Sequence, residues 1–352
     1  MSAAPIFVVG TPRSGTTLMA RILGRHPALF MGGENHFFED IFSRRRELGD
    51  PGKSAYARER ILGRLLSIYA RYNQQSDQTR VAELFAPGTD AHDRLVECQS
   101  YKGFLSTFMD FQAEAKGCRR WGNNTPKDIF HFRELLDFYP HAIFVVCVRD
   151  VRDFLVSYGL RWTVTNDDHR ERLHRLYHPI LTALLWRSTM SQLERLRTSL
   201  PRPQLAVIHY ESLVTEPEKT IERLCSIVGL SYTPSLLEVD TANSSLGHGA
   251  RGIFTQSVGS WRERLPPADA WLAERIAGWN LQRQGYTQEA KWPGLAAVVR
   301  SVAAFPIAAL RALHANRYHR GPLLQYVFRR FASLAPGRRH VPRQPDEGKE
   351  AR

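Results

Sequence analysis

A short loop near the N-terminus contains the residues best suited to bind a phosphate group. The segment reads TPRSGTT, and its relevant residues are Arg13, Ser14, Gly15, Thr16 and Thr17. If a helix begins at the second half of this segment, its first backbone N–H groups attract an anion. The arginine and the hydroxyls add further donors. The pattern therefore indicates a phosphate-binding loop, although Thr16 stands where the loop of a nucleoside triphosphatase has its lysine.

The second strand end argues against triphosphate hydrolysis. A metal-dependent triphosphatase needs a carboxylate there, and the chain reads Val148-Arg149-Asp150. Asp150 is a possible magnesium ligand, but an arginine beside it suits a phosphate better than a metal. We therefore expect a phosphate site without a metal. A P-loop nucleotide kinase or triphosphatase is the alternative.

A second anion-binding pair is predicted from Arg149 and Ser157, which are eight residues apart. The first lies at the end of a predicted strand, and the second lies about two turns along the next helix. Ligands of open α/β sheets bind beyond the carboxyl ends of the strands. We expect both side chains to reach one anionic group beside the first loop. In the alternative, the arginine pairs with Asp150 or Asp153.

Alternating apolar runs and helical patterns predict the fold that must position these residues. The predicted strands are residues 6–9, 142–148 and 204–209. The helices predicted to follow them are residues 16–25, 151–162 and 217–228. Thr215 and Glu218 have the spacing of a capping box for the last helix. Such alternation predicts an α/β, P-loop-like fold of three αβα layers around a central parallel sheet.

The rest of the chain divides into a helical insertion and a C-terminal extension. Residues 36–115 are mostly helical in pattern, with a helix over 57–72 and a loop over 73–93. We expect this insertion to shape an acceptor pocket within a catalytic domain of residues 1–290. Residues 291–335 predict a basic amphipathic helical extension. Residues 336–352 have the composition of a disordered tail.

Composition limits the classes of partner. The net charge is +13 with a pI of about 9.9, which predicts an anionic partner. A polyanion-binding or nucleic-acid-binding protein is a second alternative, but no motif supports it and we expect no nucleic acid. The four cysteines are scattered, which argues against zinc and redox motifs. With no signal-peptide pattern, we expect a cytoplasmic protein. No pattern indicates its oligomeric state.

The C-terminal extension predicts contact with an anionic membrane surface. Residues 293–352 contain 11 Lys/Arg and 3 Asp/Glu, so they carry +8 of the net charge. Leu295–Leu313 is apolar apart from two arginines and a serine, and LLQYVFRRF follows it. A central arginine costs about 2.5–3.5 kcal/mol in a spanning helix, so we expect peripheral association. The alternatives are packing on the catalytic domain, oligomerisation, or binding of a polyanionic acceptor.

Four segments together resemble a known enzyme family. They are PRSGTTLM, GGENHFF, VCVRDVRDFLVSY and VIHYESLVTEPEKTIERLCSIVGL. They resemble the sulfotransferase superfamily that uses 3′-phosphoadenosine-5′-phosphosulfate (PAPS), in its bacterial type, and more distantly the tyrosylprotein sulfotransferases. The likeness covers roughly residues 5–35, 120–160 and 204–285. It implies that PAPS is the co-substrate, that the loop binds its 5′-phosphosulfate, and that no metal is needed.

The resemblance also assigns roles to the residues that bind the donor. It implies that the loop residues form the phosphate cradle, with Arg13 on the 5′-phosphate. It assigns Arg149 and Ser157 to the 3′-phosphate, and Tyr210 to a position near the nucleotide. The segment that includes Ser257, Ser260 and Arg262 matches a loop that closes over the donor, where Arg251, Arg262 or Arg264 is expected to reach a phosphate.

The resemblance implies that Glu34 is the base that takes the acceptor proton, with His36 as its competitor. Two features depart from the tyrosylprotein branch. Asn124 replaces a lysine that supports the transferring group, with Lys127 as a possible substitute, and His36 replaces an arginine that contacts acceptor peptide. We therefore expect the acceptor hydroxyl to belong to a carbohydrate, glycolipid or small metabolite rather than to protein tyrosine.

Overall fold

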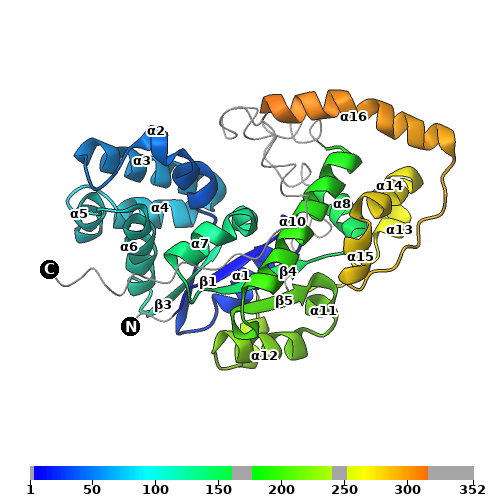
Figure 1. Cartoon of the computed structure of the whole chain (residues 1–352). Coiled ribbons are helices and arrows are strands. Elements are labelled where there is room, and N and C mark those ends of the chain that lie inside the picture. The colour runs from blue at the N-terminus through cyan, green and yellow to red at the C-terminus, as the bar shows by residue number, and fades with distance from the viewer. Residues whose placement is uncertain (1–3, 161–176, 240–251, 316–352) are drawn as a thin grey trace.

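A parallel five-stranded sheet forms the centre of the molecule (Figure 1). The computed structural model describes residues 4–160, 177–239 and 252–315. The strand order is β2-β3-β1-β4-β5, and every neighbouring pair is parallel. The strands are β1 Ile6–Gly10, β2 Leu29–Gly32, β3 Arg120–Asn124, β4 Ile143–Val148 and β5 Leu205–His209. The predicted parallel α/β fold is confirmed.

Helices cover both faces of the sheet, because both faces of β1 and β4 are apolar. The helices of the first half are α1 Thr16–Leu23, α2 Arg45–Leu48, α3 Ala55–Tyr72, α4 Gln75–Leu84, α5 Asp90–Val96, α6 Tyr101–Glu114, α7 Phe132–Phe138 and α8 Val151–Gly159. Those of the second half are α10 Pro179–Ser199, α11 Tyr210–Thr215, α12 Pro217–Val228, α13 Trp261–Arg264, α14 Pro267–Ala277, α15 Trp279–Arg283 and α16 Leu295–Ala315.

Two buried clusters separate the layers. Phe7 and Val146 face a cluster that includes side chains of α6, α7 and α10. Their neighbours Val8 and Val145 face the opposite way, into a cluster with side chains of α1 and α12. This alternation follows from the two-residue period of a strand. It gives three layers, with helices on each side of the sheet, as the sequence predicted.

The arrangement of connections leaves a binding position between β1 and β4. The chain leaves β1 through α1 toward β2 at one edge of the sheet, and leaves β4 through α8 toward β5 at the other edge. Ligands of open α/β sheets bind where neighbouring strands have connections that depart in opposite directions. The loop after β1 and the residues after β4 therefore meet at the point where a ligand is expected.

The helical insertion lies between β2 and β3 and forms its own lobe (Figure 1). The prediction of helix was right for most of residues 36–115, but the predicted loop over 73–93 was wrong. This stretch contains α4 and the start of α5. In α4, Val81 is the residue whose side chain is buried, so the helix has little apolar periodicity to reveal it.

Two strands were missed, and one local prediction was wrong. The strands β2 and β3 were not predicted, since one is four residues long and the other reads RWGNN. The capping box of α12 does not form, because the Thr215 hydroxyl donates to the carbonyl of Glu211. Pro217 occupies the first turn of α12 instead, where its missing N–H costs nothing.

Candidate active site

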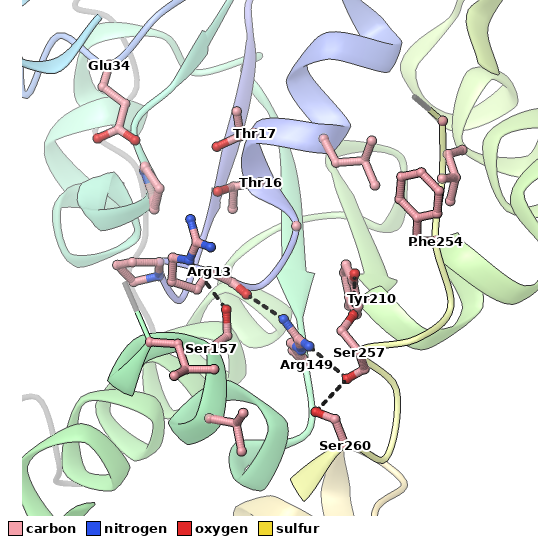
Figure 2. Close-up of a pocket in the computed structure, with 18 residues that line it drawn as sticks. Arg13, Thr16, Thr17, Glu34, Arg149, Ser157, Tyr210, Phe254, Ser257 and Ser260 are labelled. Atoms are coloured by element: carbon pink, nitrogen blue, oxygen red, sulfur yellow. Dashed lines mark hydrogen bonds between the residues drawn. The ribbon is translucent and has the colours of Figure 1, made fainter. Parts of the chain in front are cut away.

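A cleft opens at the carboxyl ends of β1 and β4. It is lined by Pro12, Arg13, Gly15, Thr16, Thr17, Leu18, Glu34, Pro126, Arg149, Val156, Ser157, Leu160, Tyr210, Gly252, Ile253, Phe254, Ser257 and Ser260. Figure 2 shows Glu34 near one end of the cleft and Arg149 with Ser257 near the other. The residues of the first loop, Arg13, Thr16 and Thr17, lie between them.

The first loop is held in an unusual backbone conformation. Arg13 has a φ of 70° and Gly15 a φ of 88°. A side chain at the glycine would put a Cβ atom 2.8 Å from the ring of Tyr210, so only glycine allows this tyrosine to reach the loop. The turn ends in α1, whose N-terminal N–H groups have no partners within the helix. This is the geometry of an anion-binding loop.

Arg149 connects the first loop to the covering segment of the cleft, which is residues 252–261. The residue is 4% exposed. Nη1 donates to the carbonyl of Arg13 at 3.1 Å, and Nη2 donates to the carbonyl of Ser257 at 2.9 Å. The guanidinium also lies 4.2 Å above the ring centre of Tyr210, whose hydroxyl is 2.8 Å from that of Ser257. Its Nε has no hydrogen-bond partner among the described residues.

The covering segment is fixed by Asp153 of α8. The carboxylate of Asp153 accepts hydrogen bonds from the backbone N–H groups of Gly259 and Trp261 and from the hydroxyl of Ser260. Burial raises the pKa of Asp153, and the positive charge of Arg149 and these backbone bonds oppose the rise. The hydrogen bonds of Asp153 thus hold the covering segment in place. The hydrogen bonds of Arg149 go to backbone carbonyls rather than to this carboxylate.

Glu34 belongs to a chain of alternating charges at the other end of the cleft. Its Oε2 is 2.9 Å from Nε2 of His36, and Nδ1 of the same ring is 3.3 Å from Glu39. Glu39 in turn accepts from the amino group of Lys127 at 3.2 Å. The Glu34 side chain is 29% exposed and lines the cleft, whereas the His36 side chain is 4% exposed and does not.

The histidine is positively charged at neutral pH. Burial alone lowers its pKa, but hydrogen bonds and the negative charges of Glu34 and Glu39 raise the pKa of His36 to about 9. Its ring lies 4.1 Å from that of Tyr72, and its backbone has a φ of 45°. In the described part of the chain, His36 and Arg13 are the two non-glycine residues with positive φ, a conformation that often accompanies functional sites.

The backbone of Glu34 is held from the insertion. The side-chain amide of Asn73, at the end of α3, donates to the carbonyl of Glu34 at 2.9 Å and to that of Tyr69 at 2.8 Å. A Cβ atom at Gly33 would lie 1.7 Å from Oδ1 of Asn73. Gly33 is therefore required for this amide to approach. The carboxylate that lines the cleft is positioned by the helical lobe as well as by the sheet.

Comparison with known proteins decides the family. The family model described as "Sulfotransferase family" matches residues 5–234, well over half of the chain. The chain belongs to the sulfotransferase family. The matched range includes the first loop, Glu34, Arg149, Ser157 and Tyr210, and it ends before the covering segment.

Individual relatives are distant. An uncharacterized protein of Aquifex aeolicus is 26% identical over 275 residues, which are 74% of this chain and 31% of that protein. Protein-tyrosine sulfotransferase 2 of Gallus gallus is 22% identical over 233 residues, 66% of this chain and 53% of that protein. The chain thus spans about a third of the length of the first relative and about half of the length of the second.

Among solved structures, the sulfotransferase domain from the curacin biosynthetic pathway has the same fold. The two chains are 14% identical, and the match covers 82% of this chain and 99% of that domain with a TM-score of 0.52. At this identity the likeness establishes the three-layer fold. The residues of the cleft are therefore interpreted from their own geometry.

Most of the residues singled out from the sequence lie together. Ten of them line the cleft: Arg13, Gly15, Thr16, Thr17, Glu34, Arg149, Ser157, Tyr210, Ser257 and Ser260. Three do not line it. Ser14 is buried beneath the loop, and His36 lies behind Glu34. Arg262 is half exposed, pairs with Glu289 and stacks on Trp261, away from the cleft.

The candidates for a second cation near the transferring group are also separated from the cleft. Lys127 is bound to Glu39, and Asn124 is buried with no partner for its Oδ1 among the described residues. Arg264 is exposed and does not line the cleft. Arg251 lies outside the described residues. Arg13 is therefore the cation of the first loop that faces the cleft, and its Nε donates to Ser157 at 3.4 Å.

Sequence reasoning did not identify the apolar wall of the cleft. Phe254, Ile253, Val156 and Leu160 line it beside the polar groups. Val156, on α8, and Leu160, at its C-terminal end, are four residues apart, so the sequence itself places them on one face of the helix. The other two lie in an irregular segment, where no periodicity identifies which side chains face a ligand.

Asp150, which the sequence offers as a possible magnesium ligand, has another role. Asp150 accepts from the backbone N–H of Arg152 at 2.8 Å and pairs with its guanidinium at 2.6 Å. It begins α8 and does not line the cleft. Within the described ranges, no group of three His, Cys, Asp or Glu side chains is arranged to hold a metal ion.

Proposed function

We propose that this protein transfers a sulfuryl group from PAPS to a hydroxyl of an acceptor by in-line displacement. The observation that carries the proposal is the buried Arg149, which lines the cleft beside the first loop with its Nε unpartnered among the described residues. A buried cation without a carboxylate partner is costly unless an anion joins it. The loop offers a second anion site next to it. Two anion sites in one cleft suit a donor with phosphates at both the 3′ and 5′ positions.

The residues fit the parts of this donor. In our proposal the first loop, with Arg13, Thr16 and Thr17, binds the 5′-phosphosulfate, while Arg149 and Ser157 bind the 3′-phosphate. The ring of Tyr210 and the apolar wall at Phe254 then contact the nucleoside. The donor supplies an activated sulfuryl group. Arg13 balances negative charge on the bisphosphate that departs.

Glu34 is the proposed base. It removes the proton from the acceptor hydroxyl while the acceptor oxygen forms a bond to sulfur and the bond from sulfur to the 5′-phosphate oxygen breaks. The ionic hydrogen bond from His36 holds the carboxylate toward the cleft. Because both ring nitrogens of His36 face carboxylates, we assign the histidine a positioning role rather than that of the base.

The acceptor is proposed to be a carbohydrate, glycolipid or small metabolite. It must approach Glu34, which lies between the first loop and the helical lobe. His36 is buried at the site where a peptide-contacting arginine is expected in the tyrosylprotein branch. This position therefore offers no exposed cation to an acidic peptide, which favours an uncharged hydroxyl compound.

Calorimetry with nucleotides tests the donor assignment. We expect 3′,5′-bisphosphoadenosine to bind much more tightly than 5′-AMP, by about 10- to 100-fold, because one charge-assisted phosphate site contributes about 1.5–3 kcal/mol. Magnesium should not be needed. Preferential binding of ATP with magnesium would instead support the P-loop kinase alternative. Binding of the bisphosphate no tighter than 5′-AMP would contradict the 3′-phosphate site.

A further inference from the structure

The C-terminal helix α16 carries an apolar face that the other described residues leave uncovered. Leu295 is 69% exposed, Val299 54%, Val302 46% and Leu310 68%. With Pro306, which is also exposed, these positions recur at intervals of three and four residues, so they line one side of the helix. Exposed apolar residues in such a row mark an interaction surface, whereas scattered ones are ordinary.

The opposite face of α16 is attached to the catalytic domain. Ser301 accepts from His178 at 3.2 Å through its carbonyl and donates to Asp269 at 3.2 Å through its hydroxyl. Phe305 lies against the ring of His178, and Ala308 is buried. Ser301, Phe305 and Ala308 are separated by four and three residues, so they lie on one side of the helix. They fix the middle of α16 against α10 and α14, so the helix lies along the molecule (Figure 1).

The charges around the exposed face are positive. Arg300 and Arg311 are both exposed, and their spacing of eleven residues puts them on the same side of the helix. They adjoin Ile307, which is 57% exposed and extends the apolar surface from the row toward the arginines. The sequence has no Asp or Glu between Trp292 and Pro345. Trp292, just before the helix, is 56% exposed, and indole rings are favoured at the boundary between lipid and water.

We propose that α16 docks the protein on an anionic membrane, with its apolar row in the acyl boundary and its arginines at the lipid phosphates. An apolar face flanked by basic residues is the pattern of helices that lie in the membrane interface. The absence of acidic residues along this stretch favours an anionic lipid surface over a protein partner of mixed charge.

The docked geometry favours a helix that lies in the interface over one that spans the bilayer. Within the described residues, Leu295–His314 is the segment long and apolar enough to cross a membrane. However, Ser301, in the first half of this segment, is bound to Asp269 and His178. A spanning orientation would carry these polar groups of α10 and α14 into hydrocarbon or break their contacts.

Vesicle flotation with the full-length protein tests the proposal. We expect binding to phosphatidylcholine vesicles that contain phosphatidylglycerol, and little binding to phosphatidylcholine alone. The double variant Val299→Glu, Val302→Glu should reduce binding about tenfold or more, because it removes apolar burial and adds negative charge. Arg300→Gln and Arg311→Gln should each reduce binding about fivefold, less at high salt.

The matched control is Tyr56→Glu. Tyr56 is 69% exposed on α3, in the helical lobe, so this change also replaces an exposed apolar side chain by glutamate. It should leave vesicle binding unchanged. All of these positions are exposed, and unchanged thermal unfolding of each variant will show that the fold is retained. Nucleotide binding should be unchanged too, since none of these residues lines the cleft.

Four outcomes would overturn the proposal. Wild-type binding by the Val299→Glu, Val302→Glu variant would exclude α16, especially if Arg338→Gln, Arg339→Gln abolished binding. Equal binding to neutral vesicles would exclude anionic recognition. Resistance of bound protein to alkaline extraction would indicate a spanning helix. A dimer by light scattering that the valine variant converts to monomer, without vesicle binding, would assign the face to a second copy.

Discussion

Charged side chains are paired differently at the two ends of the cleft. At the Glu34 end, negative and positive groups alternate through His36, Glu39 and Lys127, and each contacts the next. At the Arg149 end, a buried guanidinium binds two carbonyls and a tyrosine ring, and its Nε has no partner among the described residues. The charged groups at the Glu34 end are paired with one another, whereas the Arg149 end keeps an N–H that, in our proposal, an anion binds.

This difference separates two tasks. A base must be oriented before the substrate arrives, and a network of paired charges provides that orientation at no cost during reaction. A binding group must gain free energy from the ligand, and a cation already paired with a carboxylate would gain little. We therefore expect changes at the Glu34 end to reduce turnover and changes at the Arg149 end to reduce donor affinity.

The largest expected effect is that of Glu34→Gln on turnover. The amide keeps the shape of the side chain and still contacts His36, but it cannot accept the acceptor proton. Turnover should fall by about 10²–10⁴, while calorimetry should find unchanged binding of 3′,5′-bisphosphoadenosine. Glu39→Gln is the comparison variant: Glu39 binds the same histidine but does not line the cleft, so its loss of turnover should be much smaller than that of Glu34→Gln. Normal turnover by Glu34→Gln would remove this residue from the mechanism.

The second effect is on affinity. Arg149→Ala should weaken binding of 3′,5′-bisphosphoadenosine by about 10- to 100-fold and that of 5′-AMP much less, because a charged hydrogen-bonding partner of the 3′-phosphate is lost. Arg262→Gln, which alters an arginine paired with Glu289 outside the cleft, should change neither. An equal loss for both nucleotides would mean that Arg149 acts by holding the loop and the covering segment together, and the contrast between the two ends would fail.

The smallest effect is that of His36→Gln. Glutamine can donate to one of the two carboxylates but carries no charge, so Glu34 is held less firmly. We expect turnover to fall about tenfold, the equivalent of one weak charged hydrogen bond, with donor affinity unchanged. A loss as large as that of Glu34→Gln would instead make the histidine a candidate for the base.

The pH dependence of the same variant sharpens this test. The folded pKa of His36, about 9, is above the ordinary value of 6.5, so its stabilising charge is fully present below pH 6.5 and is lost as pH rises through about 9. Turnover and thermal stability of the wild type should therefore decline toward the variant's values around pH 9. Burial raises the pKa of nearby Asp128 to about 7. A change in turnover or stability near pH 7 should therefore persist in the His36→Gln variant. The other titratable groups that face the histidine are Glu34, Glu39 and Tyr72, and Lys127 binds Glu39 from the other side.

Much of the fold and most of the cleft were predictable from the sequence because they depend on local patterns. The strands β1, β4 and β5 are continuous apolar runs, and each is followed directly by polar residues. Since the carboxyl ends of parallel strands lie at one edge, the residues after these strands had to meet. This argument required no knowledge of side-chain contacts.

The parts that were missed depend on tertiary contacts. β3 lies in the interior of the sheet although it reads RWGNN, because Asn123 is satisfied by Asp128 and Asn35. No local pattern reveals such a buried polar strand. Similarly, the pairing of Arg262 with Glu289 depends on how an irregular segment folds over α8. The network around His36 was also hidden, since Lys127 is far away in sequence.

The contacts of Arg149 have a consequence for how the chain is made. All five strands lie within residues 6–209, so the sheet can assemble once roughly the first two thirds of the chain have left the ribosome. Arg149 finds the carbonyl of Arg13 at that stage, but its second carbonyl, that of Ser257, is synthesised much later. A nascent chain therefore acquires a folded centre before it acquires a covered cleft. Premature termination before this serine would release a molecule that resembles the full chain in its sheet and lacks the cover of its cleft.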